Sequence, residues 1–125
     1  MTTDADRWLA KAKRHLATAH LNADHNGFCD TTCYFAHQTV ELALKAYLIA
    51  HAVDFPKVHA LPQLLSLCIL QNSEFSRFAD DMAFLNGFYI ETKYPLDVAC
   101  DPSLEDTNKA LDIADKMIGI IEKQF

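Results

Sequence analysis

Apolar residues recur three and four positions apart along most of the chain, which is the period of amphipathic α-helices. The pattern predicts five helices and no strand. Turn-forming or proline-containing stretches separate them, such as "DHNG" (24–27) and "VDFPKVHALP" (53–62). The predicted helices cover residues 3–22, 29–52 and 61–70, a fourth stretch from about residue 74, and a last one that starts after residue 103.

The start of the last helix carries a capping signal, because Ser103 is followed three residues later by Asp106. We find no internal repeat and no composition change that would mark a domain boundary. The expected fold class is therefore all-α, an antiparallel bundle of four to five helices, formed as one domain by residues 1–125.

The second predicted helix is apolar on two sides. Its main line runs from Cys33 to Leu48, and a second line lies about half a turn away. A helix that is apolar on two sides is normally buried on both, and in a small bundle we expect the second contact to be another copy of the chain. The fourth predicted helix likewise has more apolar surface than one contact requires. The predicted homodimer interface comprises Phe35, Leu42, Ile49, Phe84 and Phe88.

Composition and charge narrow the classes of protein to which the chain can belong. Half of the 125 residues are hydrophobic, which excludes intrinsic disorder. The formal net charge of −6 argues against a broad basic surface, so duplex DNA is not an expected partner. No stretch of about 18 apolar residues and no signal peptide occurs, so we expect no membrane association. With four cysteines and no targeting signal, reduced thiols and a cytoplasmic location are expected.

Four potential metal ligands are spaced four residues apart: His25, Cys29, Cys33 and His37. Neighbouring members of this series would share one helical face, but all four span about three turns and cannot reach one ion. We therefore predict no metal site here and interpret Cys33 as a core residue. No glycine-rich phosphate loop or dinucleotide fingerprint occurs, and no cofactor is predicted.

A polar seam lies between the two apolar lines of the second helix. Glu41 and Lys45 form an i, i+4 pair in the favourable order, which on an open surface stabilises a helix by about 0.2–0.5 kcal/mol. The position between two contact faces favours desolvation, so a charge here is either register-setting or ligand-facing. The alternative is an ordinary solvated pair.

The stretch "FAHQTVELALKAYLIAHAVDFPKVHALPQLL" (35–65) resembles the HEPN domain. The later "FLNGFYIETKYPLD" (84–97) is similar to the segment of one HEPN branch that ends in Arg-Tyr-Pro-Asp, and here reads Lys93-Tyr94-Pro95-Leu96-Asp97. "RWLAKAKRHLATA" (7–19) fits the usual opening helix. The resemblance implies a bundle of four or five helices that commonly dimerises. It also implies a nucleotide- or RNA-related role, often beside a minimal nucleotidyltransferase in a toxin–antitoxin-type pair.

Members of the family that cut RNA carry Arg, four to six residues, and then His on a late helix. Arg14 and His20 match this spacing but lie on the first predicted helix, and the late helices contain no His. We therefore assign no catalytic residue, and a protein without enzymatic activity is the favoured interpretation. The alternative is a metal-independent ribonuclease with a divergent site, in which His59 or His20 acts as the general base beside a cation.

The resemblance to the non-nuclease branch implies a ligand-binding set of Glu41, Lys45, His59, Lys93 and Tyr94. If the three cationic groups converge, they would hold a phosphate while Tyr94 stacks on a base. The alternative is structural, with His59 packing against the third helix and Tyr94 supporting the loop. The leading hypothesis is thus a homodimer that binds a nucleotide, RNA or a nucleotidyltransferase partner. A further alternative is a structural adaptor that docks another protein.

Overall fold

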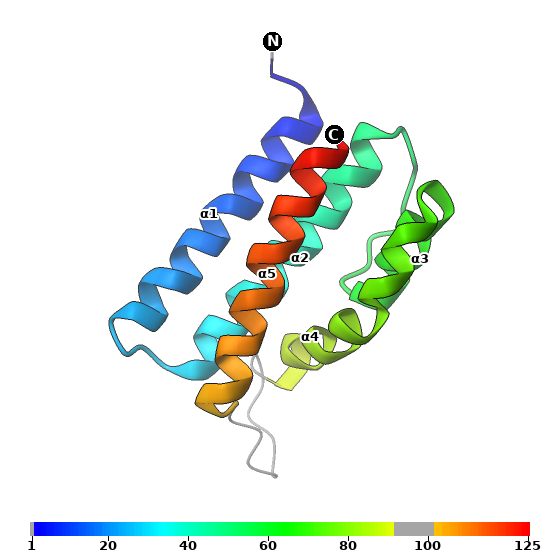
Figure 1. The fold of residues 1–125 in the computed structure, drawn as a ribbon. Coiled ribbons are helices and arrows are strands. Elements are labelled where there is room, and N and C mark those ends of the chain that lie inside the picture. The colour runs from blue at the N-terminus through cyan, green and yellow to red at the C-terminus, as the bar shows by residue number, and fades with distance from the viewer. Residues whose placement is uncertain (1, 92–101) are drawn as a thin grey trace.

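The computed structural model describes residues 2–91 and 102–125, and the predicted all-α fold is confirmed there. The described ranges contain five α-helices, a short 3₁₀-helix and no strand (Figure 1). Lys93 and Tyr94 of the predicted binding set lie outside the described residues. The elements are α1 (Asp4–Asp24), α2 (Cys29–Ala50), α3 (Leu61–Gln71), η1 (Ser73–Phe78), α4 (Ala79–Glu91) and α5 (Leu104–Gln124).

The helix ends follow from local chemistry. The Ser103 hydroxyl accepts a hydrogen bond from the Asp106 amide at 3.0 Å, as the sequence predicts, and so satisfies one free donor of α5. Thr3 and Asp6 form a reciprocal capping box at the start of α1. Helix α2 ends two residues before the predicted boundary, because Ala52 adopts a left-handed conformation with φ of 56°. The predicted fourth helix begins as the 3₁₀-helix η1 before α4.

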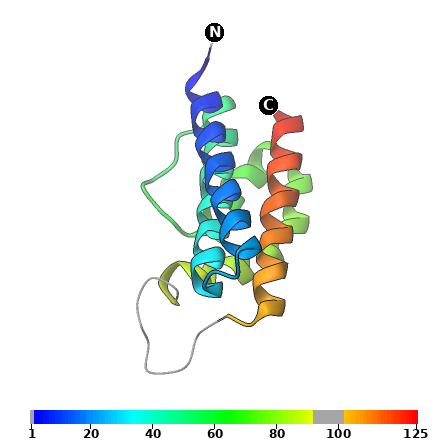
Figure 2. The same ribbon diagram turned by 90° about the vertical axis from the view of Figure 1, so that its left-hand side faces the viewer.

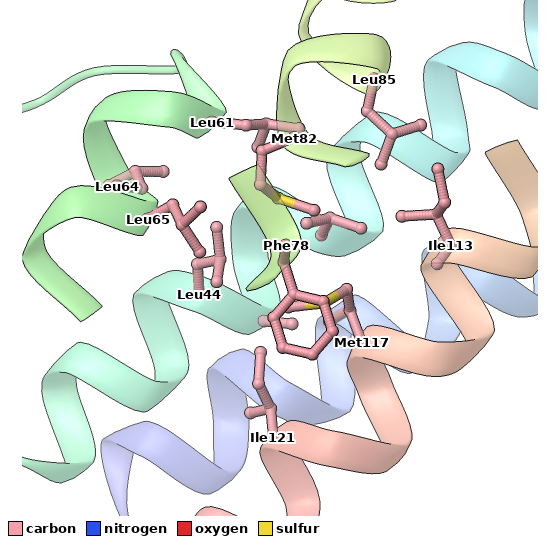
Figure 3. Close-up of a cluster of buried hydrophobic side chains, with 14 of the residues drawn as sticks. Leu44, Leu61, Leu64, Leu65, Phe78, Met82, Leu85, Ile113, Met117 and Ile121 are labelled. Carbon is pink, nitrogen blue, oxygen red and sulfur yellow. The ribbon is translucent and has the colours of Figure 1, made fainter. Parts of the chain in front are cut away.

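Helix α2 is the central element and packs against α1, α3, α4 and α5 of the same chain. Figure 2 shows α1 running along α2 on the outside of the bundle. Side chains from α2, α3, η1, α4 and α5 meet in one apolar core (Figure 3). Its members include Leu44, Leu61, Leu64, Leu65, Phe78, Met82, Leu85, Ile113, Met117 and Ile121.

Packing within one chain covers much of the second apolar line of α2, which the sequence analysis attributed to a second copy. This second line comprises Phe35, Leu42, Ala46 and Ile49, and Ala46 is fully buried. Phe35, Leu42 and Ile49 are only half-buried and keep apolar surface. Phe88 is 7% exposed in the single chain and offers little surface to a partner. The homodimer interface stays a prediction. Among its predicted residues, the half-buried ones have the most apolar surface left for contact with a second copy.

Candidate functional site

The Glu41–Lys45 pair of α2 is buried. Lys45 Nζ donates a hydrogen bond to Glu41 Oε2 at 3.0 Å, and the two residues, Lys45 and Glu41, are only 7% and 4% exposed. The i, i+4 spacing places both on one face of the helix. Because both charges are withdrawn from water, each depends on the other far more than in an exposed pair.

His59 reaches the same carboxylate from the segment that joins α2 to α3. Its Nδ1 lies 3.0 Å from Glu41 Oε2, while its side chain remains 53% exposed. Asn86 of α4 accepts a hydrogen bond from the Leu61 amide at 3.0 Å, which ties the end of this segment to α4. The structure therefore brings together Glu41, Lys45 and His59, three of the five residues predicted for ligand binding.

His37, one turn before Glu41, completes the cluster. Its Nδ1 lies 3.9 Å from Glu41 Oε1, too far for a hydrogen bond. Neither ring nitrogen of His37 nor Glu41 Oε1 has a hydrogen-bond partner within the part of the chain that the structure describes. Burial lowers the pKa of His37 to about 4, against the opposing effect of the Glu41 charge. At neutral pH the imidazole is uncharged.

Aromatic rings enclose the cluster on two sides. Tyr89 of α4 contacts both imidazoles, with ring centroids 5.3 Å from His37 and 4.9 Å from His59. Lys45 Nζ also lies 5.8 Å from the Phe55 ring centroid, and Phe55 meets Trp8 of α1 edge-on at 6.3 Å. These rings exclude water from the ion pair, and His59 is the member that opens to solvent.

Sequence reasoning did not place His37 or Tyr89 in the site. The sequence analysis names His37 in a series of potential metal ligands and expects no metal there, although the spacing of residues 37, 41 and 45 places His37 on one helical face with Glu41 and Lys45. Tyr89 shows no sequence signal of this kind, because its approach to two imidazoles depends on how α4 packs against α2.

The series His25, Cys29, Cys33 and His37 does not come together. Among the described residues, no group of three or more His, Cys, Asp or Glu side chains is placed to hold a metal ion. Cys33 is fully buried, with Sγ 3.7 Å from the Thr107 hydroxyl, and burial raises the pKa of its thiol to about 11. This matches its interpretation as a core residue.

Arg14 and His20, which match the spacing of the nuclease motif, lie at the surface. His20 Nε2 lies 2.8 Å from Asp115 Oδ1 of α5, and both side chains are close to half exposed. Arg14 is exposed on α1. The pair of His20 and Asp115 is a single, largely exposed contact between two helices, unlike the buried cluster at Glu41.

Together, the fold and the cluster define an all-α bundle with a buried carboxylate on its central helix and nitrogen donors converging on it. The family model of the HEPN domain matches residues 5–124, so the chain belongs to the HEPN family. The resemblance found in the sequence is confirmed.

Two solved structures share the fold. The crystal structure of TT1696 from Thermus thermophilus has a TM-score of 0.80 and 22% sequence identity, covering 99% of this chain and 100% of that one. ST0689, described as an archaeal HEPN homologue, has a TM-score of 0.77 and 17% identity, covering 98% of each chain. No curated protein matches the sequence. In the described ranges, no helix is both long and apolar enough to cross a membrane.

Proposed function

We propose that this HEPN protein is a cytoplasmic homodimer that binds a nucleotide at the cluster of Glu41, Lys45 and His59. The nucleotide is either free or presented by a minimal nucleotidyltransferase partner, with the two proteins forming a toxin–antitoxin-type pair. The observation that carries the proposal is the buried Glu41 carboxylate, which holds two nitrogen donors from separate segments at 3.0 Å each.

The arrangement suits recognition because the donors are held in place before a ligand arrives. Lys45 and His59 share one carboxylate oxygen, so their positions are coupled. His59 is the exposed member and is the group that would contact a phosphate oxygen first.

Charge sets a requirement on this site. Glu41 and Lys45 cancel, so the described cluster is neutral unless His59 carries a second proton. A phosphate therefore needs either that proton or a further cation. Lys93, which the family resemblance implies for this role, lies outside the described residues, as does Tyr94, the predicted stacking residue.

The proposal is tested by thermal unfolding and calorimetry with ATP, and with adenosine as the ligand without phosphates. At a concentration of 100 times the Kd, ATP should stabilise the folded state by about 2.7 kcal/mol. Adenosine should bind at least about tenfold more weakly, because a charge-assisted phosphate contact contributes about 1.5–3 kcal/mol.

Matched variants locate the effect. His59→Gln should reduce ATP binding about tenfold, since it removes the solvent-exposed imidazole of the cluster, the group placed to contact a phosphate. His20→Gln is its control, because it removes an imidazole that also pairs with a carboxylate, at 2.8 Å. No stabilisation by millimolar ATP, or equal effects of both variants, would contradict the proposal.

His59 also keeps the ribonuclease alternative testable, since a half-exposed imidazole that a carboxylate holds in place can act as a general base. RNA cleavage that persists in His20→Ala and disappears in His59→Ala would establish that activity and replace the binding proposal. Co-purification with a nucleotidyltransferase without any nucleotide effect would instead support the adaptor alternative.

A further inference from the structure

A row of basic residues lies on the outer face of α1. Arg7, Lys11 and Arg14 follow the i, i+4, i+7 spacing of one helical face, and all three are exposed. With Trp8 of α1 and Leu42 of α2 they line a groove of about 350 Å³. We call this surface the α1/α2 groove.

The positive charge of the α1/α2 groove is poorly compensated. Arg7 pairs with Asp4, but within residues 2–91 and 102–125 no carboxylate pairs with Lys11 or Arg14. Their field reaches a neighbouring imidazole: burial, followed by the charges of Lys11 and Arg14, lowers the pKa of His15. This surface is therefore locally cationic on a chain whose formal charge is −6.

An apolar row runs along α2 beside the basic one. Phe35, Leu42 and Ile49 are seven residues apart and half-buried, and they span about 21 Å of the helix. Phe35 stacks on His15 of α1 at 5.4 Å between ring centroids, so the two rows lie against each other. A heptad row of apolar residues is the pattern that one helix offers to another.

The charge of the α1/α2 groove selects the kind of helix that fits. Phe35, Leu42 and Ile49 also belong to the predicted homodimer interface, but a second copy that packed the same face against this one would bring two cationic rows together, which like-charge repulsion disfavours. The apolar row of α2 is therefore assigned to another protein, and the proposed homodimer would use other surfaces, such as the one around the half-buried Phe84. A helix with an apolar stripe and an acidic flank satisfies both rows at once. We propose that the α1/α2 groove docks an acidic amphipathic helix of a partner protein.

The groove adjoins the proposed nucleotide site through Trp8, which meets Phe55 beside Lys45. None of the five groove residues is Glu41, Lys45 or His59, so the two proposals can fail separately, and the peptide titrations are carried out without nucleotide.

The protein carries its own reporter for such docking. Trp8 is the single tryptophan and lines the groove. The probe is a capped peptide of about 15 residues, or four helical turns, with leucine at heptad a and d positions and glutamate on both flanks. The control peptide has lysine in place of every glutamate. The glutamate peptide should change Trp8 emission and bind at least about tenfold more tightly than the lysine peptide.

Charge reversal sharpens the experiment. A triple variant with Arg7→Glu, Lys11→Glu and Arg14→Glu should invert the preference and bind the lysine peptide more tightly. The matched control reverses three lysines of α5, at positions 109, 116 and 123, which are also exposed. It has the same net charge and should keep the preference of the unmodified protein. Circular dichroism should show that both variants remain helical.

Four results would overturn the proposal. Equal binding of the two peptides would show that the charge of the groove does not select the partner. A Trp8 signal that does not respond to the glutamate peptide would show that the peptide does not dock in the groove. Tighter binding of a short single-stranded RNA that displaces the peptide would identify the groove as a nucleic-acid surface. Dissociation of a dimer by the α1 reversal, seen in sedimentation, would assign the groove to a second copy.

Discussion

Removal of Lys45 tests whether the cluster at Glu41 behaves as a buried ionic unit. In Lys45→Met the methionine retains most of the apolar stem, while Glu41 keeps its charge and loses one of two donors. Glu41 and Lys45 are 4% and 7% exposed, so water cannot replace the lost bond without opening the helix packing. Breaking a buried pair in this way costs about 3–5 kcal/mol.

His59 sets the lower end of this estimate. It lies 3.0 Å from the same oxygen, so the carboxylate keeps one hydrogen-bond donor when Lys45 is removed. We therefore expect the free energy of unfolding to fall by about 3 kcal/mol in Lys45→Met. In the double variant Glu41→Gln/Lys45→Met no charge remains to be compensated, and stability should return to within about 1 kcal/mol of the unmodified protein.

Urea unfolding of the single and double variants gives the coupling energy of the pair. A second cycle on Lys13 and Glu122 provides the comparison, because this pair joins α1 to α5 at 2.6 Å but its side chains are 49% and 42% exposed. The surface pair should show a coupling of about 0.2–1 kcal/mol. A coupling at Glu41 and Lys45 no larger than that would refute the argument that burial makes the cluster a unit.

Three further predictions concern pH and helix stability. Because the pKa of His37 is about 4 when folded and 6.5 ordinarily, the unfolded chain binds more protons, so stability should fall as pH drops from about 6.5 to about 4. The loss of stability should reach about 3 kcal/mol, since a tenfold change in proton affinity is about 1.4 kcal/mol. Urea titrations at several pH values should show this loss in the unmodified protein but not in His37→Leu. Gly119→Ala should stabilise the protein by about 0.5–1 kcal/mol, because a Cβ at this exposed position of α5 meets nothing within 4 Å, and a lower melting temperature would contradict this. Ser103→Ala should destabilise by about 1 kcal/mol in urea unfolding, through loss of the hydroxyl that caps α5, whereas Ser66→Ala, with no capping role, should not.

Helix positions were predictable because their causes are local. The capping hydroxyl of Ser103 and the break around Gly27 are both readable in a few residues. The exception lies between α3 and α4, where the Asn72 side chain accepts a hydrogen bond from the Glu74 amide and a 3₁₀ turn precedes the α-helix. Such a turn differs from an α-helical start by one hydrogen-bond register, which hydrophobic spacing does not resolve.

The candidate site was predictable only where one helix supplies it. The spacing of Glu41 and Lys45 places them together in any α-helix, but their burial depends on helices that pack around α2. His59 was tied to them through the family resemblance, and its contact with Glu41 requires the path of the segment after α2. The two apolar lines of α2 illustrate the same limit: amphipathicity shows how many faces are covered, but not whether the cover comes from the same chain.

The cluster is difficult to explain by stability alone. Apolar residues of similar volume would be neutral or stabilising in place of a buried ion pair, and His37 adds two ring nitrogens without partners in the described chain. Stability would thus be served as well by a simpler core at this position. What the ion pair supplies, and an apolar core would not, is a fixed orientation for the exposed His59 donor at the surface. A fixed His59 would serve the proposed ligand, so the ATP experiment and the double variant should be read together. A double variant that folds as stably as the unmodified protein but no longer binds ATP would separate the binding role of the cluster from its structural one.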